Sequence, residues 1–181
     1  SFIYVHLDVF ANYDKIKTDL AKGQIETKIE SILNEYNNNM LGSFDVNLSE
    51  VDMMTYVMNQ MPFLKSIYSK KTLRIYSDII NKNNPILLIN FANSIVPKTF
   101  KTNTITLGDG ITQFYYNDYF GNGILYAVKL DNTLYDNVSR GTINYSTGEV
   151  KMNFPIYIKV DKNKLISSAI PENPDINSYL N

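Results

Sequence analysis

The chemistry open to this chain starts from its only histidine, His6, which stands two residues before Asp8. Residues two apart in a strand share a face, so the carboxylate could orient the imidazole as a general base. The sequence places no nucleophile beside this pair, and the chain has no cysteine. A single histidine in a strand more often packs or forms hydrogen bonds. We therefore predict no catalytic residues and no enzymatic activity.

Metal sites are equally poorly supported. One histidine and no cysteine cannot build the usual zinc arrangements. The run Asp161, Lys162 and Asn163 resembles the start of a calcium loop, but the required glycine and closing glutamate are missing. We read this run as a turn and predict no metal site.

The chain contains two pairs of closely spaced glycines, an arrangement that can bind phosphate through backbone N–H groups. They are Gly108 with Gly110 and Gly121 with Gly123. Neither pair precedes a helical pattern, so neither supplies a helix N-terminus for a phosphate group. They are typical of hairpin turns, in which glycine adopts positive φ. We predict no cofactor and no small-molecule substrate.

The densest aromatic run offers more possibilities. It consists of Phe114, Tyr115, Tyr116, Tyr119 and Phe120. Such a run can form a stacking platform, a protein interface, or a core on one face with cross-strand pairs on the other. Alternation along a strand places only half of these rings on one face. A carbohydrate-binding surface module using Tyr115, Tyr116 and Tyr119 is therefore our alternative prediction of function.

Composition limits the class of protein. The chain has 181 residues, 44% of them hydrophobic, which is ordinary for a globular protein with one core or two small domains. The net charge is −1 and the basic residues are scattered, which argues against a nucleic-acid partner. No apolar run of about 18 residues is present, and we predict no membrane partner. Because strand pattern begins at once after Ser1, we expect the chain to be a fragment of a longer protein.

The first part of the chain predicts a strand, two helices and a strand. Residues 2–10 alternate between apolar and polar, and Asp14 is a plausible N-cap for a helix over residues 15–37. Ser49 is predicted to cap a second helix that ends before Pro62. Residues 63–80 are predicted to be extended. The second helix is expected to turn one face inward, formed by Val51, Met54, Met58 and Met61.

The second part of the chain predicts short antiparallel strands separated by turn residues. The predicted strands are residues 86–91, 104–107, 111–116, 123–130, 141–145, 149–154 and 156–160. The fold class is therefore α+β, with a strand-helix-helix-strand α/β layer followed by a mostly antiparallel β domain. The predicted domains are residues 1–82, residues 83–169, and an extended C-terminal arm over residues 170–181 that is ordered against a partner.

One hairpin is locally distinctive. It runs Gly141-Thr142-Ile143-Asn144-Tyr145-Ser146-Thr147-Gly148-Glu149-Val150. We predict that Ile143 and Tyr145 lie across from Val150 and Met152, with Gly148 in the left-handed position of a tight loop.

Two stretches together resemble a known family. The opening strand, the helix through Ile25 and Tyr36, the Leu41-Gly42 break and the helix capped by Ser49 resemble the C-terminal part of baseplate J-like proteins of contractile-tailed bacteriophages. The Gly141 hairpin is similar to a Gly-x-Ile-Asp-Tyr-x-Thr-Gly pattern in baseplate wedge proteins of T-even-type phages. Asn144 departs from that pattern, in which aspartate is expected.

The resemblance implies a structural virion protein of the tail baseplate wedge, assembled in the host cytoplasm. It implies that the chain pairs with itself as a homodimer, that a ring of dimers surrounds the central hub, and that other baseplate wedge proteins are partners. It implies no enzymatic activity and supplies no catalytic residues. It also implies that this chain is the C-terminal fragment of a longer protein.

Overall fold

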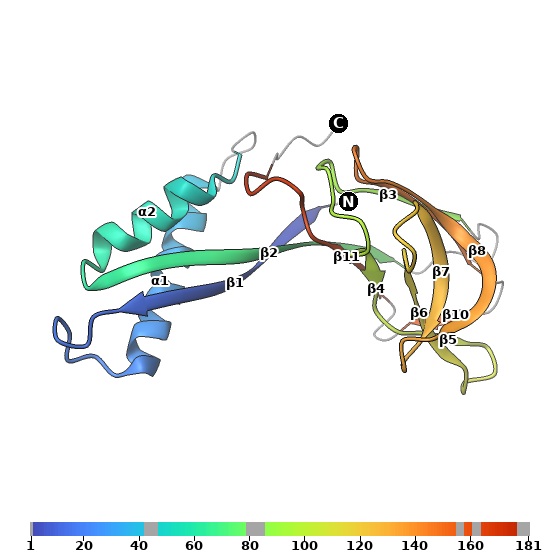
Figure 1. Ribbon diagram of the computed structural model, residues 1–181, viewed down its shortest axis with the longest axis horizontal. Helices are drawn as coiled ribbons and strands as arrows, with labels where there is room; N and C mark the ends of the chain where they lie inside the picture. The colour runs from blue at the N-terminus through green and yellow to red at the C-terminus, as the bar shows by residue number, and fades with distance from the viewer. Residues whose placement is uncertain (1, 42–46, 79–85, 155–157, 161–163, 177–181) are drawn as a thin grey trace. The chain divides into compact units, whose positions relative to one another are not determined.

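The computed structural model in Figure 1 describes residues 2–41, 47–78, 86–154, 158–160 and 164–176. Within these residues it has two helices and eleven strands, which confirms the predicted α+β class. The helices come early in the chain and antiparallel strands dominate the rest. In chain order the elements are β1 (Ile3–Tyr13), α1 (Lys22–Met40), α2 (Glu50–Gln60), β2 (Leu64–Asp78), β3 (Ile86–Asn90), β4 (Lys101–Thr102), β5 (Ile105–Leu107), β6 (Gln113–Asn117), β7 (Ile124–Lys129), β8 (Leu134–Asn144), β9 (Glu149–Asn153), β10 (Ile158–Val160) and β11 (Lys164–Ala169).

The chain forms two compact units. The helical unit contains residues 7–71 and 174–181, and the β unit contains residues 1–6 and 72–173. The long strands β1 and β2 therefore contribute residues to both units. The domain boundary expected between residues 82 and 83 lies outside the described residues. The division between the two compact units falls instead within β1, after His6, and within β2, after Lys71.

The helical unit is built on one apolar core. Ile25, Ile29 and Ile32 recur at helical spacing on α1 and are buried with residues of α2 and β2. Val9 and Ala11, on alternate positions of β1, pack against the same core. The two helices therefore cover one face of the β1–β2 ribbon (Figure 1), and the other face of the ribbon is left to solvent.

The start of α1 differs from the prediction. The helix begins at Lys22 with Ala21 as N-cap, and Asp14 is not its cap. Asp14 Oδ1 instead accepts the Ile16 N–H at 3.1 Å, and Thr18 Oγ1 accepts the Leu20 N–H at 3.2 Å. These local hydrogen bonds stabilise turns that compete with a helix here, and strand β1 extends beyond the predicted residues 2–10 to Tyr13.

The cap of α2 is confirmed, while its buried face is corrected. Ser49 Oγ accepts the Asp52 N–H at 3.3 Å. Val51, predicted to face the core, is 72% exposed, whereas Met53 and Val57 are buried. The buried face follows residues 53, 57 and 61 at a spacing of four, together with Met54.

The β unit is a mostly antiparallel sheet with the order β1-β2-β11-β4-β6-β7-β8-β9-β3, and β5 pairs with both β6 and β10. Strands β4 and β11 were not predicted. Strand β11 pairs with the second half of β2 in the register Leu165 to Ser77. Strand β8 is also longer than predicted, because it begins at Leu134.

The described part of the predicted C-terminal arm, residues 170–176, pairs with other residues of its own chain. In the β unit, Pro171 forms a bridge with Ile95, and the Val96 N–H donates to Ile170 O. In the helical unit, Ile176 forms a bridge with Leu48, and both side chains are buried. Within the described residues, this segment is therefore ordered against its own chain.

The β8–β9 hairpin has the predicted loop and a different register. Ile143 lies opposite Val150 as predicted, but Gly141 rather than Tyr145 lies opposite Met152. Gly148 has a φ of 73°, which confirms the left-handed position. Gly141 has a structural role, because a Cβ there would lie 1.9 Å from Lys151 O.

Candidate functional site

The residues considered for catalysis lie on a surface strand. His6 and Asp8 occupy exposed, alternate positions of β1, as the alternation predicts. In the part of the chain that the structure describes, no three histidine, aspartate or glutamate side chains are grouped so that they could hold a metal ion. The calcium-like run at residues 161–163 lies outside the described residues.

The predicted aromatic platform is divided by burial. Phe114 and Tyr116 are buried in the β unit, and Tyr116 Oη donates to Asn153 O at 2.8 Å. Burial raises the pKa of Tyr116 far above that of free tyrosine, so its hydroxyl stays protonated. Tyr115 occupies an alternate position of the same strand and donates its hydroxyl to Asn132 Oδ1 at 2.7 Å. Tyr116 is therefore unable to contact a sugar in a platform with Tyr115 and Tyr119.

The remaining surface rings do not form a flat face either. Tyr119 and Phe120 meet edge to face at 5.1 Å, and Phe120 meets Tyr126 in the same way at 5.3 Å. Sugars and bases stack on a ring face, and perpendicular rings do not present a continuous one. The geometry therefore does not favour the carbohydrate platform.

A different aromatic pair lies on the open face of the helical unit. Phe10 on β1 stacks on Tyr68 of β2, with ring centroids 5.1 Å apart and planes at 15°. Lys70 Nζ lies 5.5 Å from the centroid of the Phe10 ring. Phe10 is 40% exposed and Tyr68 is 51% exposed, so two large rings remain partly in water. Pairs of this kind are typical of interface cores.

The strand that carries Phe10 is also a sheet edge. Among the described strands, β1 lies at the end of the order and neighbours β2 alone. Edge strands present backbone N–H and C=O groups to another strand, and proteins usually protect them with lysine, proline or bulges. The segment Leu7–Tyr13, which we call the edge segment, has neither lysine nor proline, and its only charged residue is Asp8.

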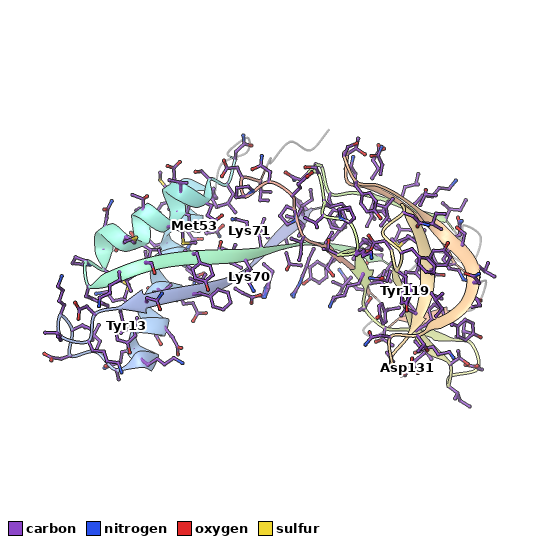
Figure 2. The ribbon with its side chains drawn as sticks, viewed as in Figure 1. Tyr13, Met53, Lys70, Lys71, Tyr119 and Asp131 are labelled. Atoms are coloured by element: carbon purple, nitrogen blue, oxygen red, sulfur yellow. The ribbon has the colours of Figure 1, made fainter. Side chains whose placement is uncertain are left out.

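The ribbon beneath this surface is held to α2 by a buried ion pair. Lys71 Nζ lies 2.6 Å from Glu50 Oε2, while Glu50 Oε1 accepts the Ser69 hydroxyl at 2.8 Å. Figure 2 shows Lys70 and Lys71 on opposite sides of β2, in agreement with strand alternation. Burial acts to raise the pKa of Glu50, but the hydrogen bonds from Lys71 and Ser69 and the Lys71 charge outweigh it. The pKa is therefore lower than usual.

The α2 N-terminus has a second anchor. Asp175 Oδ1 accepts the Glu50 N–H at 3.2 Å, beside the bridge between Leu48 and Ile176. A carboxylate at a helix N-terminus is favourable because the first N–H groups lack partners within the helix. The Lys71–Glu50 ion pair and the Asp175 hydrogen bond both hold α2 against the rest of the helical unit. The strands that carry the exposed Phe10–Tyr68 pair are therefore packed against a well-connected helix.

The β unit has its own exposed aromatic residues. Tyr4 meets Tyr76 edge to face at 5.1 Å, and Phe2 is 68% exposed. Tyr4 and Tyr76 come from the ends of β1 and β2 that belong to the β unit, and Phe2 directly precedes β1 in the same unit.

Sequence reasoning did not single out Phe10, Tyr68 or the edge position of β1. The usable signal was the alternation itself, which placed Phe10 on the polar face of the strand. The edge position is seen only in the strand order, in which no described strand other than β2 pairs with β1. Strand order depends on contacts distant in sequence, which a local pattern does not contain.

Comparison of the sequence with protein-family models and with curated protein sequences gives no match. Neither helix in the described part of the chain is long and apolar enough to cross a membrane.

Proposed function

We propose that this chain is a structural subunit of the baseplate wedge of a contractile phage tail. It acts through contacts with further copies of itself and with other wedge proteins. Its location is the virion, and it carries out no reaction. Copies associate as homodimers, and the dimers join into a ring around the hub.

The observation that carries the proposal is the edge segment with its exposed aromatic pair. A strand with a single charged residue and a stacked, half-exposed Phe10–Tyr68 pair is suited to protein association. The near-neutral net charge of −1 also suits a subunit whose interface cores carry few ionised groups. The resemblance to baseplate J-like proteins supplies the kind of assembly.

The direct test is location. Antibodies raised against the purified chain should label the baseplate end of contractile tails in immunogold electron microscopy of virions whose genome encodes the chain. Virions from which the gene has been deleted provide the control. Labelling along the tail tube, on the capsid or nowhere on the particle would contradict the proposal.

A further inference from the structure

We propose that the edge segment Leu7–Tyr13 pairs with the same segment of a second copy of this chain. The two strands run antiparallel, and the register is centred on Phe10. This inference rests on the proposed function, in which copies associate, and it assigns the surface through which they do so. The pairing lies wholly within the helical unit.

The residues of the edge segment are complementary in this register. A two-fold axis through Phe10 places Phe10 opposite Phe10 of the second copy, Asp8 opposite Asn12 and Val9 opposite Ala11. A carboxylate then meets an amide that can donate to it, twice in each interface. The small apolar Val9 and Ala11 meet on the face that packs against the helices.

Neighbouring registers are less favourable. Centring on Asp8 places two carboxylates directly opposite one another. Centring on Ala11 places Asp8 opposite Asp14, with the same repulsion, and centring on Val9 places Asp8 opposite the apolar ring of Phe10. Like charges directly across a strand pair are destabilising. The charges of the segment therefore favour the axis at Phe10.

The pairing would also extend the two-stranded ribbon of the helical unit and cover its exposed aromatic pair. In this unit, β1 and β2 form a two-stranded ribbon, and such ribbons gain stability when further strands extend them. Joining two ribbons through β1 gives a four-stranded sheet with helices on one face. On the open face it creates a row of four rings, in which each stacked Phe10–Tyr68 pair adjoins the other. Water is then excluded from the exposed part of Phe10.

Disulfide trapping tests the register, because the chain has no cysteine and an introduced one is its only thiol. Directly opposed residues in antiparallel strands have Cα atoms about 4.5–5.5 Å apart, within disulfide range. Phe10→Cys should therefore form a covalent dimer under mild oxidation. Val51→Cys, at an exposed position of α2, is the matched control and should stay largely monomeric.

The Asp8–Asn12 pair gives an independent arm of the trapping test. Asp8→Cys and Asn12→Cys proteins should each crosslink poorly alone and should form a mixed dimer when combined. A register centred on Leu7 would instead place Phe10 opposite Tyr4, so Leu7→Cys would crosslink and Phe10→Cys would not. That result would overturn the proposed register.

A charge swap tests the same pairing without chemical crosslinking. Asn12→Asp places two carboxylate pairs in each interface and should weaken the dimer roughly tenfold. Adding Asp8→Asn exchanges the two groups, restores one carboxylate opposite one amide, and should return the dissociation constant to that of the original chain. Failure of the double variant to recover, with its fold intact by circular dichroism, would overturn the proposal.

The outcomes separate this inference from the proposed function. A chain that dimerises by mass, but in which Phe10→Cys crosslinks no faster than Val51→Cys, associates through another surface. The edge-segment pairing is then wrong, while self-association stands. A chain that stays monomeric at all concentrations and does not crosslink removes both the pairing and the homodimer. Immunogold labelling of tails would still test the virion location separately.

Discussion

Phe10 and Tyr68 stack across β1 and β2 on the face of the ribbon that the helices do not cover, with their ring centroids 5.1 Å apart. The stack orders two large side chains at the sheet edge already in the unbound chain. Ordering costs conformational entropy, and a pair that is already ordered lowers this cost on association. The pair is therefore a fixed part of the surface rather than two independent side chains.

Removing one ring of this pair should affect association more than folding. Tyr68→Ala should lower the free energy of unfolding by about 1 kcal/mol, because the ring is half exposed and loses mainly its stack. The dimer should weaken clearly over the same concentrations. Denaturant titration and sedimentation measure the two effects, with Val51→Ala on α2 as the surface control. A large loss of folding stability with unchanged association would contradict this reading.

The Lys71–Glu50 pair should be needed for the stability of the helical unit. Lys71→Met leaves the Glu50 carboxylate in a partly buried site without its cation and should cost about 3 kcal/mol. The exposed pair Lys22–Glu26 offers a matched control, since Lys22→Met should change stability by less than about 0.5 kcal/mol. Chemical denaturation at neutral pH compares the two variants. Equal effects would show that burial of the first pair is unimportant.

The same pair predicts a dependence on pH. Because the folded pKa of Glu50 is lower than its unfolded value, its contribution is present above about pH 4.3 and is lost as the pH falls through the folded pKa. Glu50→Gln should be less stable than the original chain at pH 7, and the difference should shrink toward pH 2. Denaturation series at several pH values measure this. A difference that stays constant with pH would contradict the assignment.

The stability linked to Asp118 should change with pH in the opposite direction to that linked to Glu50. Burial raises its pKa, although its carboxylate accepts the Lys98 N–H at 2.6 Å and the Tyr145 hydroxyl at 3.1 Å. Stability linked to this group is therefore greatest at low pH and falls as the pH rises from about 3.9 through the raised folded pKa. Asp118→Asn should remove that slope. An unchanged slope, measured by denaturation across this pH range, would exclude Asp118 as its source.

Two glycines should respond to alanine in opposite ways. A Cβ at Gly141 would lie 1.9 Å from Lys151 O, so Gly141→Ala must displace the β8–β9 backbone and should cost several kcal/mol or prevent folding. Gly23 lies in α1 with nothing within 4 Å of its Cβ position, and Gly23→Ala should stabilise by about 0.5–1 kcal/mol. Thermal denaturation of both variants measures the contrast. Similar shifts in the two would contradict the close approach at Gly141.

Local patterns predicted the elements whose causes are local. Strict alternation gave β1, Ser49 marked the start of α2, and Gly148 marked the β8–β9 turn, since each depends on neighbouring residues. The start of α1 was misplaced because Asp14 is equally suited to capping a helix and to forming a local turn. The fold class followed from the order of the elements alone.

The parts that were missed depend on distant residues. Strand β11 pairs with β2, and the buried Asp118 carboxylate accepts hydrogen bonds from Lys98 and Tyr145, which lie far from it along the chain. The candidate surface was missed for the same reason. A pattern can place Phe10 on the outer face of a strand, but the edge position of β1 follows only from the order of the described strands.

Association of the chain with itself through the edge segment can be measured in solution. The most direct measurement is the solution mass of the original chain and of Phe10→Glu, by light scattering after size exclusion, across a wide range of concentrations. The original chain should rise from 20.8 kDa toward twice that mass, while Phe10→Glu should stay at the monomer mass because two carboxylates would meet at the axis. An original chain that stays at 20.8 kDa throughout, or a Phe10→Glu variant that associates equally well, would contradict association through the edge segment.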